Sequence, residues 1–506
     1  MRKLVLTLLA AAAAPVLLAR PPAPPPTPTP TTPRVFDPNR PPAQEMETAI
    51  GDGFTLAAVG DLIISRPLSQ LLPRDAGFAS VARIVREADV AFGNFETVAV
   101  DPGRIPGAPH PGVGDVSLLS EPAVAGDLAK LGFDMVSRAN NHALDWGVES
   151  MRETSRILDA AGLVHAGVGE NRGEARAARY FESPLGRVGL VSMASTFSEY
   201  ADALPPRGRA PARPGLSALR VERTVVVTPE TLRQLRSVQA ALAGPVLRCE
   251  VTSAWEAERR QKEREPSDEL NLLDIEFRVG ERAAYRYEMN PEDVAGILNA
   301  IRLGKQHSDL LVATIHAHET GLGCEEPGDF LPVLARAAID AGAGVFIAHG
   351  EHRLMPIEIY KGRPIFYSLA NFFWSDILEP LSASTWETNR DLAIRSSADP
   401  AKATDADLLA AWNSEAFDDP RVFETVIAVT RWEAGRVADV RLYPVDLGYG
   451  ERLTRSGTPR LASPPVARRI LERLQRISKP YGTSIAIEGD VGIIRLTPAP
   501  PAGVAR

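Results

Sequence analysis

Acidic, amide and imidazole side chains follow five short apolar runs of the chain, each at or just beyond the end of the run. If these runs are strands of an open α/β sheet, the side chains meet at one edge, because ligands bind beyond the carboxyl ends of such strands. Imidazoles combined with hard oxygen ligands suit one or two Zn, Mn or Fe ions at a hydrolytic centre. In chain order the candidates are Asp61, Asn94, Glu96, Asn140, Asn141, His142, Asp145, His316, His318, His349 and His352.

Each of these residues, taken singly, has a simpler explanation. Asp and Asn are common turn and helix-cap residues, and a single His is more often a surface or satisfied polar residue than a ligand. The chain, however, has only eight His, and five of them fall at or just beyond predicted strand ends. Polar residues in such positions are unfavourable unless they have partners or a task. The joint pattern therefore favours a metal site.

The apolar runs that precede these residues have the length of buried strands and are bounded by turn residues. Helical patterns lie between them. Alternating strand and helix signals indicate an α/β fold with much parallel pairing. The expected strands are 55–59, 88–92, 133–137, 188–193, 309–315 and 344–347, and the expected helices are 122–131, 147–161, 291–306 and 331–341.

Residues 200–290 interrupt this alternation with Pro-rich, helical and strongly polar pieces. We interpret them as an insertion on the surface of the domain, in preference to a separate domain. Inside the insertion, two β-rich runs at 275–279 and 283–289 are separated by three residues that include a glycine, which predicts a β-hairpin. Near the C-terminus the pattern predicts a helix over 466–478, followed by two short strands.

The composition is that of an ordinary globular protein. Hydrophobic residues make up 44% of the 506 positions and charged residues 24%, so a large core can form. The net charge of −8 is mild for this length and argues against a nucleic-acid partner. The two cysteines, Cys249 and Cys324, fit either unpaired thiols or one bridge, and the sequence leaves both open.

The N-terminus carries two cations followed by a short apolar stretch, which is typical of a secretory signal peptide over residues 1–19. An uncleaved membrane anchor is the alternative. Residues 20–50 are rich in Pro and Thr, which predicts an extended linker. Residues 51–498 would form the folded domain and 499–506 a tail. We therefore expect a secreted or periplasmic protein.

Five stretches of the chain carry a specific resemblance. They read AAVGDLI, ADVAFGNFETV, DMVSRANNHALDWG, LLVATIHAHE and FIAHGEHRLMPIEIYKGRPIFYSLANFFW. In this order they resemble the poly-γ-glutamate capsule synthesis protein family of the calcineurin-like metallophosphoesterase superfamily. The resemblance covers about residues 54–496. It implies an α/β four-layer sandwich, in which two facing β-sheets are flanked by helices.

The resemblance also implies roles for the candidate residues. His142 would be catalytic and would face the leaving group as an acid or as a stabiliser of the transition state. Glu96 would be a carboxylate that bridges two ions. The metal ligands would be Asp61, Glu96, Asn141, His316, His349 and His352. Residues that hold these ligands or contact the substrate would be Asn94, Asn140, Asp145, His318, Glu319 and Arg138.

The chain departs from the superfamily pattern at three places. Ile63 stands where an Asp-x-His motif would supply a histidine ligand. His349 and His352 are spaced more widely than in the usual His-x-His motif, and Ala370 stands where Gly is usual. These departures leave open whether one or two ions bind and whether full phosphoesterase chemistry is retained.

Two further residues have two interpretations each. Arg138 can meet an anionic substrate or pair with a carboxylate. His165 can line the site after a short strand or serve a structural role.

The function expected from these features is that of an exported metal-dependent hydrolase in capsule or exopolymer synthesis. A metal-activated water would attack a phosphoester or an amide of an anionic polymer of the poly-γ-glutamate type. The expected partners are that polymer or a phosphoester substrate, and the family resemblance adds capsule-synthesis membrane proteins. The alternative is a non-catalytic extracytoplasmic accessory protein that binds the polymer or helps to export it.

Overall fold

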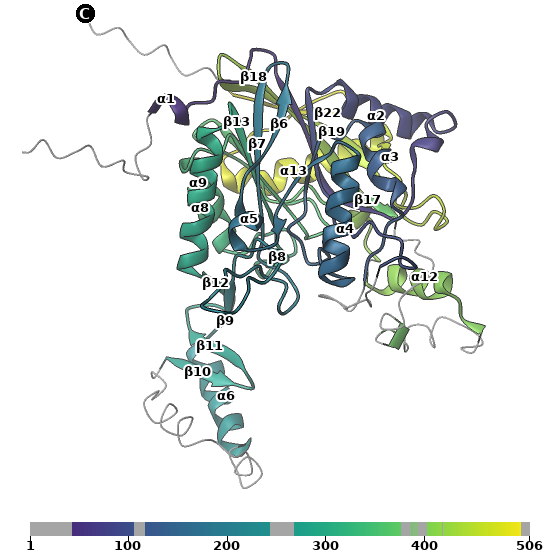
Figure 1. Cartoon of the computed structure of the whole chain (residues 1–506). Coiled ribbons are helices and arrows are strands. Elements are labelled where there is room, and N and C mark those ends of the chain that lie inside the picture. The colour runs from purple at the N-terminus through teal and green to yellow at the C-terminus, as the bar shows by residue number, and fades with distance from the viewer. Residues whose placement is uncertain are drawn as a thin grey trace, which may run out of the picture. The chain divides into compact units, whose positions relative to one another are not determined.

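The computed structural model describes residues 43–105, 117–242, 268–375, 386–387, 389, 391, 402–416 and 418–496 (Figure 1). The expected signal peptide, most of the expected linker and the expected tail lie outside these ranges, as does Cys249. Cys324 is exposed. Within the described ranges, every helix is too short or too polar to span a lipid bilayer.

The fold begins earlier than residue 51. A short helix α1 (Ala43–Met46) packs against helix α8 (Pro291–Gln306). The backbone N–H of Ala49 donates a hydrogen bond to the carbonyl of Asp309 at 3.0 Å, and Ile50 is buried. Residues 43–50 are therefore part of the domain and not of the linker.

The first sheet contains ten of the described strands, and its central strands are parallel. Strand β1 lies between β2 and β18, and its C-terminal half pairs with β17. The order across the sheet is β21-β22-β19-β18-β1-β2-β3-β4, and β20 pairs with β19. The strands are β1 (Thr55–Ile64), β2 (Val90–Asn94), β3 (Met135–Ser137), β4 (Val164–Ala166), β17 (Asn371–Ser375), β18 (Glu424–Glu433), β19 (Arg436–Asp446), β20 (Arg460–Leu461), β21 (Ala486–Glu488) and β22 (Val491–Arg495).

The second sheet contains six of the described strands in the order β15-β16-β14-β13-β7-β6. Strand β13 is parallel to both of its neighbours, β7 and β14. The two ends of the sheet are antiparallel pairs, β6 with β7 and β15 with β16. The strands are β6 (Arg179–Ser183), β7 (Gly186–Ala194), β13 (Leu310–His316), β14 (Val345–His349), β15 (Ile357–Tyr360) and β16 (Arg363–Phe366).

The two sheets face one another and are covered by helices on their outer faces (Figure 1). Alternate residues of a strand point to opposite faces, so each sheet supplies two cores. On β1, Leu56 and Ala58 belong to the core shared with the second sheet, while Ala57 and Val59 belong to the core under the helices. This arrangement confirms the predicted four-layer α/β sandwich.

The helix layers have amphipathic helices whose apolar sides are buried. Helices α2 (Ala76–Glu87), α3 (Ala123–Leu131) and α4 (Gly147–Ala160) cover the first sheet. Helices α8 and α9 (Phe330–Asp340) cover the second sheet. Burying a Leu or Ile side chain contributes about 1.5–3 kcal/mol, so these contacts hold the layers together. Helix α13 (Pro464–Ser478) packs against β19 and β22 of the first sheet and β15 of the second.

The predicted hairpin in the insertion is wrong. Strands β11 (Ile275–Val279) and β12 (Ala284–Met289) form, but both pair with β9 (Val221–Val227), which lies between them. The run Thr-Val-Val-Val in β9 has strong β propensity and offers both of its edges. Strand β10 (Glu269–Leu272) completes this small sheet, and helix α6 (Pro229–Leu242) packs against β10 and β11.

The insertion is tied to the sandwich by polar contacts at its base. Asp293 of α8 accepts hydrogen bonds from Arg176 at 2.7 Å and from Arg220 at 2.7 Å. The ring of Tyr287 lies against Phe330, with centroids 5.7 Å apart, and its backbone N–H donates to Asp329. The base of the insertion is thereby fixed against helices α8 and α9.

The remaining predicted elements are found near their expected positions. The strand signals correspond to β1, β2, β3, β7, β13 and β14, and the helix signals to α3, α4, α8 and α9. The C-terminal helix and the two strands after it are α13, β21 and β22, and the two strands pair antiparallel. Strand β1 is longer than expected, because it continues through Gly60 to Ile64.

Candidate metal centre

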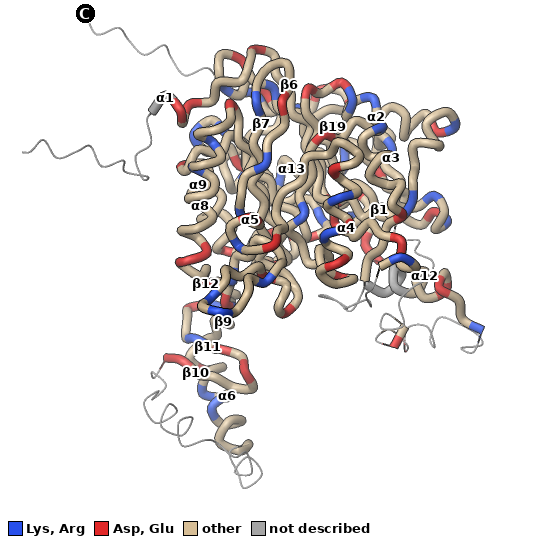
Figure 2. The backbone as a smooth tube through the Cα atoms, in the orientation of Figure 1, with Lys and Arg blue, Asp and Glu red and all other residues tan. Residues whose placement is uncertain are grey.

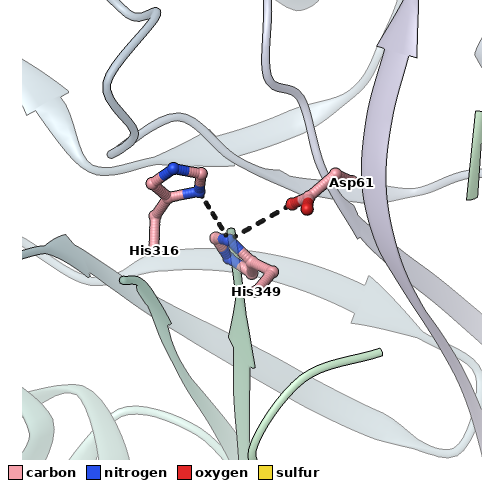
Figure 3. A group of neighbouring side chains, drawn as sticks. All are labelled: Asp61, His316 and His349. Atoms are coloured by element: carbon pink, nitrogen blue, oxygen red, sulfur yellow. Dashed lines mark hydrogen bonds and ion pairs between the residues drawn. The ribbon is translucent and has the colours of Figure 1, made fainter. Parts of the chain in front are cut away.

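A cluster of buried imidazoles and carboxylates lies between the two sheets. Asp61 comes from β1 of the first sheet, whereas His316 and His349 end β13 and β14 of the second. The strand register places His316 directly opposite His349. Figure 3 shows these three side chains pointing toward one another. Two strand ends of the second sheet therefore meet a residue within β1 of the first sheet, so these three side chains come together as the sequence predicted, although β1 does not end before Asp61.

The first group of candidate ligands consists of Asp61, His316 and His349, all fully buried. The Nδ1 atoms of the two histidines are 3.1 Å apart, and His349 Nδ1 lies 3.5 Å from Asp61 Oδ1. Ligand atoms that share one ion at about 2 Å stand about 3–3.5 Å from each other. The three side chains thus have the spacing of ligands to a common cation.

The second group consists of Glu96, His318 and His352. It adjoins the first group through His316, whose Nε2 lies 2.9 Å from His318 Nε2 and 3.6 Å from Glu96 Oε1. His352 Nδ1 lies 3.6 Å from Asp61 Oδ2. The two groups therefore form one continuous cluster with room for two sets of ligands.

Two asparagines hold the carboxylates in place. Asn94 donates from Nδ2 to Asp61 Oδ1 at 2.8 Å, and the same nitrogen lies 3.4 Å from Glu96 Oε2. Asn140 donates to Asn94 Oδ1 at 3.1 Å and to the carbonyl of Phe95 at 2.9 Å. Both amides are fully buried. Their hydrogen bonds fix the carboxylates without contributing charge.

His142 and Asp145 form a pair at the edge of the cluster. His142 Nδ1 lies 2.7 Å from Asp145 Oδ2, which also accepts a hydrogen bond from the backbone N–H of Leu118 at 2.6 Å. The other ring nitrogen, Nε2, lies 4.0 Å from Glu96 Oε1. A carboxylate on Nδ1 orients the ring and leaves Nε2 facing the cluster.

The donors present fit a divalent metal ion. Glu96 Oε1 and Asn141 Oδ1 are buried, and neither has a hydrogen-bond partner among the described residues. A buried oxygen without a partner is unfavourable by about 1–3 kcal/mol. A cation beside Glu96 Oε1, where His316 and His142 also lie, would satisfy that oxygen. The mixture of imidazole nitrogens with carboxylate and amide oxygens suits Zn, Mn or Fe.

The electrostatics of the cluster keep its ligands in the form that binds metal. Burial lowers the pKa of His349 to about 4 and that of His318 to about 3, and it holds the pKa of His316 well below its usual value. Burial alone would raise the pKa of Asp61, but its contacts with His352 and His349 and the hydrogen bond from Asn94 lower it to about 2. Neutral imidazoles beside an ionised carboxylate are ready to bind a cation.

Glu96 shows the opposite shift. Burial, the charge of Asp61 and the charge of Asp145 raise the pKa of Glu96 well above its usual value. Two carboxylates that share a buried site repel one another when both are ionised. A divalent cation between Asp61 and Glu96 would remove that repulsion.

Further carboxylates lie near the cluster. Glu319 accepts hydrogen bonds from Ser195 Oγ at 2.7 Å and from Thr196 Oγ1 at 3.0 Å. Burial raises the pKa of Glu351 to about 8, with a further contribution from the charge of Glu319. The backbone N–H of His318 donates to Thr196 Oγ1 at 2.9 Å. Glu319 thus shares with His318 a partner that positions the imidazole.

The structure brings together eleven of the residues singled out from the sequence and places His318 differently from expectation. We expected His318 to support ligands, but it stands among them as a member of the second group. Arg138 lies apart, since no described hydrogen bond or ion pair joins it to the cluster. The clustered residues are Asp61, Asn94, Glu96, Asn140, Asn141, His142, Asp145, His316, His318, His349 and His352.

Sequence reasoning missed Asn371 and the backbone of Gly350. Asn371 Oδ1 lies 2.7 Å from His352 Nδ1, and Gly350 N–H donates to Asp61 Oδ2 at 3.1 Å. Asn371 begins β17, so a search at strand ends passes over it. The signal that could have found it is its place within the motif Ser-Leu-Ala-Asn-Phe.

Two of the departures from the superfamily pattern have structural explanations. Ile63 is buried in the core under the helices, and His318 supplies an imidazole to the second group instead. Ala370 adopts a φ of 59°, a conformation that favours glycine. The Ala370 carbonyl accepts a hydrogen bond from Asp61 N–H at 2.9 Å, and a Cβ atom at Gly60 would lie 1.7 Å from the same oxygen. Gly60 therefore allows the close approach that positions Asp61.

Proteins of known sequence resemble this chain over most of its length. Proteins y4sH and y4uA of Sinorhizobium fredii, both described as uncharacterized, are each 45% identical over 459 residues, which are 89% of this chain and 94% of theirs. The PGA biosynthesis protein CapA of Bacillus subtilis is 23% identical over 353 residues, 69% of each chain.

A solved structure from Staphylococcus aureus, provisionally named a 5′-nucleotidase, aligns with 63% of this chain and 49% of its own, at 11% identity and a TM-score of 0.31. That score is too low for conclusions about fold or activity. The family model for bacterial capsule synthesis protein PGA_cap matches residues 55–375. These residues carry every candidate ligand. The chain belongs to the bacterial capsule synthesis protein PGA_cap family.

Proposed function

We propose that this protein is an exported metal-dependent hydrolase of capsule or exopolymer synthesis, which cleaves a phosphoester or an amide in an anionic polymer of the poly-γ-glutamate type. One observation supports the hydrolase most strongly. Two adjoining groups of candidate ligands lie together in the interior, and the buried Glu96 Oε1 among them has no hydrogen-bond partner within the described residues. The family and its CapA relatives support the link to capsule synthesis.

The residues that would hold one or two ions are those of the two groups, together with Asn141. A divalent transition metal bound there would supply Lewis acidity and an activated water. Asn94, Asn140 and Gly350 N–H would keep Asp61 and Glu96 in position, as they do through the hydrogen bonds described above.

His142 would act on the leaving group. Asp145 holds Nδ1 of the ring at 2.7 Å, so Nε2 is the atom that faces the cluster and can carry a proton to the departing oxygen or nitrogen. Asp145 itself is held by Leu118 N–H at 2.6 Å. The hydrogen bond to Asp145 therefore restricts rotation of the His142 ring, which would keep Nε2 directed toward the leaving group.

Metal analysis combined with a substrate screen tests this proposal. We expect the purified full chain to contain at least one transition-metal ion and to hydrolyse a phosphodiester or a glutamate polymer. The substitution His142→Ala should abolish turnover and leave the metal content unchanged. His307→Ala, at an exposed histidine that ends α8, is the matched control. A metal-free protein, or turnover that survives His142→Ala, would overturn the proposal.

The second candidate function is a non-catalytic accessory protein that binds the anionic polymer or helps to export it, with capsule-synthesis membrane proteins as partners. Ile63 favours it, since this side chain has no ligand atom where the superfamily pattern has a histidine. Saturable binding of a glutamate polymer without any cleavage, in protein loaded with metal, would support this function over the hydrolase.

Export rests on the pattern of residues 1–19. Fractionation of cells that produce the full chain tests it. We expect the protein outside the cytoplasm, with a mature terminus near residue 20, whereas an intact terminus in the membrane fraction would indicate an anchor.

A further inference from the structure

A second charged site lies on the side of the sandwich, away from the cluster of ligands. It is a cavity of about 900 Å³ that we call the arginine groove, and Arg152, Arg156, Arg179 and Arg187 line it. The groove runs beside β4 and β6, the edge strands of the two sheets, which contact one another. Its volume is in the range of small-molecule sites.

Three of these arginines already have carboxylate partners, and one has none. Arg152 donates two hydrogen bonds to Glu170, at 2.7 and 2.6 Å, and Arg187 lies 2.7 Å from Glu182. Arg156 pairs with Glu153 at 2.5 Å. Arg179 is exposed, and within the described ranges its guanidinium forms no hydrogen bond or ion pair. Of the four lining arginines, Arg179 alone thus has no partner among the described residues. Figure 2 shows basic and acidic residues interspersed near α4.

A buried cation lies beneath this surface. Arg138 is fully buried, and none of its three guanidinium nitrogens has a hydrogen-bond partner in the described part of the chain. Burial lowers its pKa to about 9, and the nearest compensating charge is that of Asp159. An uncompensated charge in the interior is strongly unfavourable. Asp159 therefore compensates the charge of Arg138 only in part and without a hydrogen bond, so a further anion nearby would stabilise the guanidinium.

The strand register places Arg138 on the groove side of the first sheet. Ser137, the last residue of β3, hydrogen-bonds Ser192 of the second sheet at 2.7 Å, so the next side chain, that of Arg138, points to the opposite face. On that face lies His165 of β4, which is opposite Val136 in the ladder. His165 lines the groove and lies 3.3 Å from Asp159, also a lining residue.

We propose that the arginine groove binds a polyvalent oxyanion, carried either by a small phosphate compound or by carboxylates of a polymer. Arg179 would donate to it directly, since a planar guanidinium matches the oxygen pairs of phosphate and carboxylate. Arg152 and Arg156 could exchange their exposed partners for it. The anion would also place negative charge above the buried Arg138.

This site is separate from the proposed hydrolase centre. The arginine groove is lined by residues of α4, β4 and β6, and none of its lining residues belongs to the two groups of candidate ligands. Binding in the groove therefore requires neither metal nor His142, so the two proposals can fail independently.

Calorimetric titration with pyrophosphate tests the groove, using the full chain after chelation of metal and removal of the chelator by dialysis. We expect one saturable site whose Kd rises at least fivefold in Arg179→Ala and at least threefold in Arg138→Met. Arg468→Ala, at an exposed arginine of α13, is the control and should leave the Kd unchanged. His142→Ala should leave it unchanged as well.

A second arm distinguishes the sources of the anion. A glutamate oligomer replaces pyrophosphate in the same titration. The probe with the lower Kd indicates whether the natural anion is a phosphate compound or a carboxylate polymer. The proposal is overturned if neither probe binds saturably. It is equally overturned if Arg179→Ala and Arg138→Met, each shown to be folded by circular dichroism, bind both probes as the unchanged protein does.

Discussion

The cluster of ligands and the arginine groove both remove charge from water, but they compensate it differently. Asp61 lies in the cluster with hydrogen bonds from Asn94 and Gly350 and two imidazoles within 3.6 Å. Arg138 lies near the groove with no described partner for any side-chain nitrogen. A buried charge is stable only when partners replace the lost water. In the cluster, those partners are side chains and backbone groups of the protein itself. Near the groove, the partner would be an anion bound from solution.

The comparison also shows how one strand serves two sites. Residues 140–145 follow β3 and enter the cluster through Asn140 and His142. Arg138, only two residues before Asn140, points to the other face of the same sheet. The segment that follows β3 therefore contributes His142 and Asp145 to the cluster on one face of the sheet and the Arg138 guanidinium to the other face.

Among the substitutions that test this comparison, removal of the Asp61 carboxylate should have the largest effect on metal binding and turnover. Asp61→Ala takes away one candidate ligand and the acceptor for Asn94 and Gly350. Because even residues that only support a ligand alter metal affinity about 10–100-fold, we expect metal binding to weaken more than about 100-fold and turnover to be lost. Metal content by mass spectrometry checks this. Asp340→Ala, at a surface aspartate, is the control, and unchanged metal content in Asp61→Ala would contradict the expectation.

Disturbing the pair at the edge of the cluster should separate proton transfer from metal binding. His142→Ala is expected to abolish turnover with metal retained, because a positioned acid or base contributes about 10²–10⁴-fold to the rate. Asp145→Asn keeps the shape but removes the charge that orients the ring, so we expect a smaller loss and an altered pH profile of kcat. An identical pH profile in Asp145→Asn would show that Asp145 is only a packing residue.

Removing the buried carboxylate of Asp61 should weaken metal binding. Removing the buried cation of Arg138, in contrast, should stabilise the protein. Arg138→Met deletes an incompletely compensated charge and keeps an apolar stem, so we expect the free energy of unfolding to rise by about 1–3 kcal/mol in dilute buffer. Saturating pyrophosphate should shrink this difference, since the anion would stabilise only the unchanged protein. Urea denaturation with and without the anion measures both values. A variant that is less stable in dilute buffer would contradict this account of Arg138.

The remaining expected effect is on the pH dependence of stability. Burial and the charge of Arg138 lower the pKa of His165 to about 4. The unfolded chain takes up this proton near pH 6.5 but the folded chain does not, so His165 lowers stability as the pH falls from about 6.5 to about 4. The slope is at most about 1.4 kcal/mol per pH unit.

Substitution isolates this contribution from that of other histidines. We expect stability curves of His165→Gln to be flatter than those of the unchanged protein in that pH window and parallel to them above about pH 7. Arg138→Met should narrow the window, because it removes one cause of the lowered pKa. Equal slopes in all three proteins would exclude His165 as the titrating group.

Much of the fold and the ligand set could be predicted from the sequence, because both follow from short local patterns. Buried runs such as 309–315 end at polar residues, and parallel strands bring their carboxyl ends together. That rule found Asp61, Glu96, His316 and His349 without any contact information. The four-layer arrangement came from the family resemblance and is confirmed by the cores on both faces of each sheet.

The errors concern choices that local patterns do not encode. The runs 275–279 and 283–289 read as a hairpin, but β9, some fifty residues earlier, has the edges to pair with both. The direction of Arg138 depends on which face of β3 meets the second sheet. Asn371 begins a strand and approaches His352 only through the parallel pairing of β17 with β1. Each of these outcomes is decided by pairing between distant segments.

Strand β18 has a practical consequence for anyone preparing a shorter protein. The family match ends at residue 375, yet β18 and β19 follow it in the first sheet, where β18 pairs with β1 and β19 pairs with β18. A fragment trimmed to the matched range would lose β18 and β19. It would leave Thr55–Ala58 with a bare edge and would uncover Leu56 and Ala58, which share a core with Val426 and Val440. Such edges recruit other chains, so soluble fragments should extend to residue 496, the end of the described sandwich.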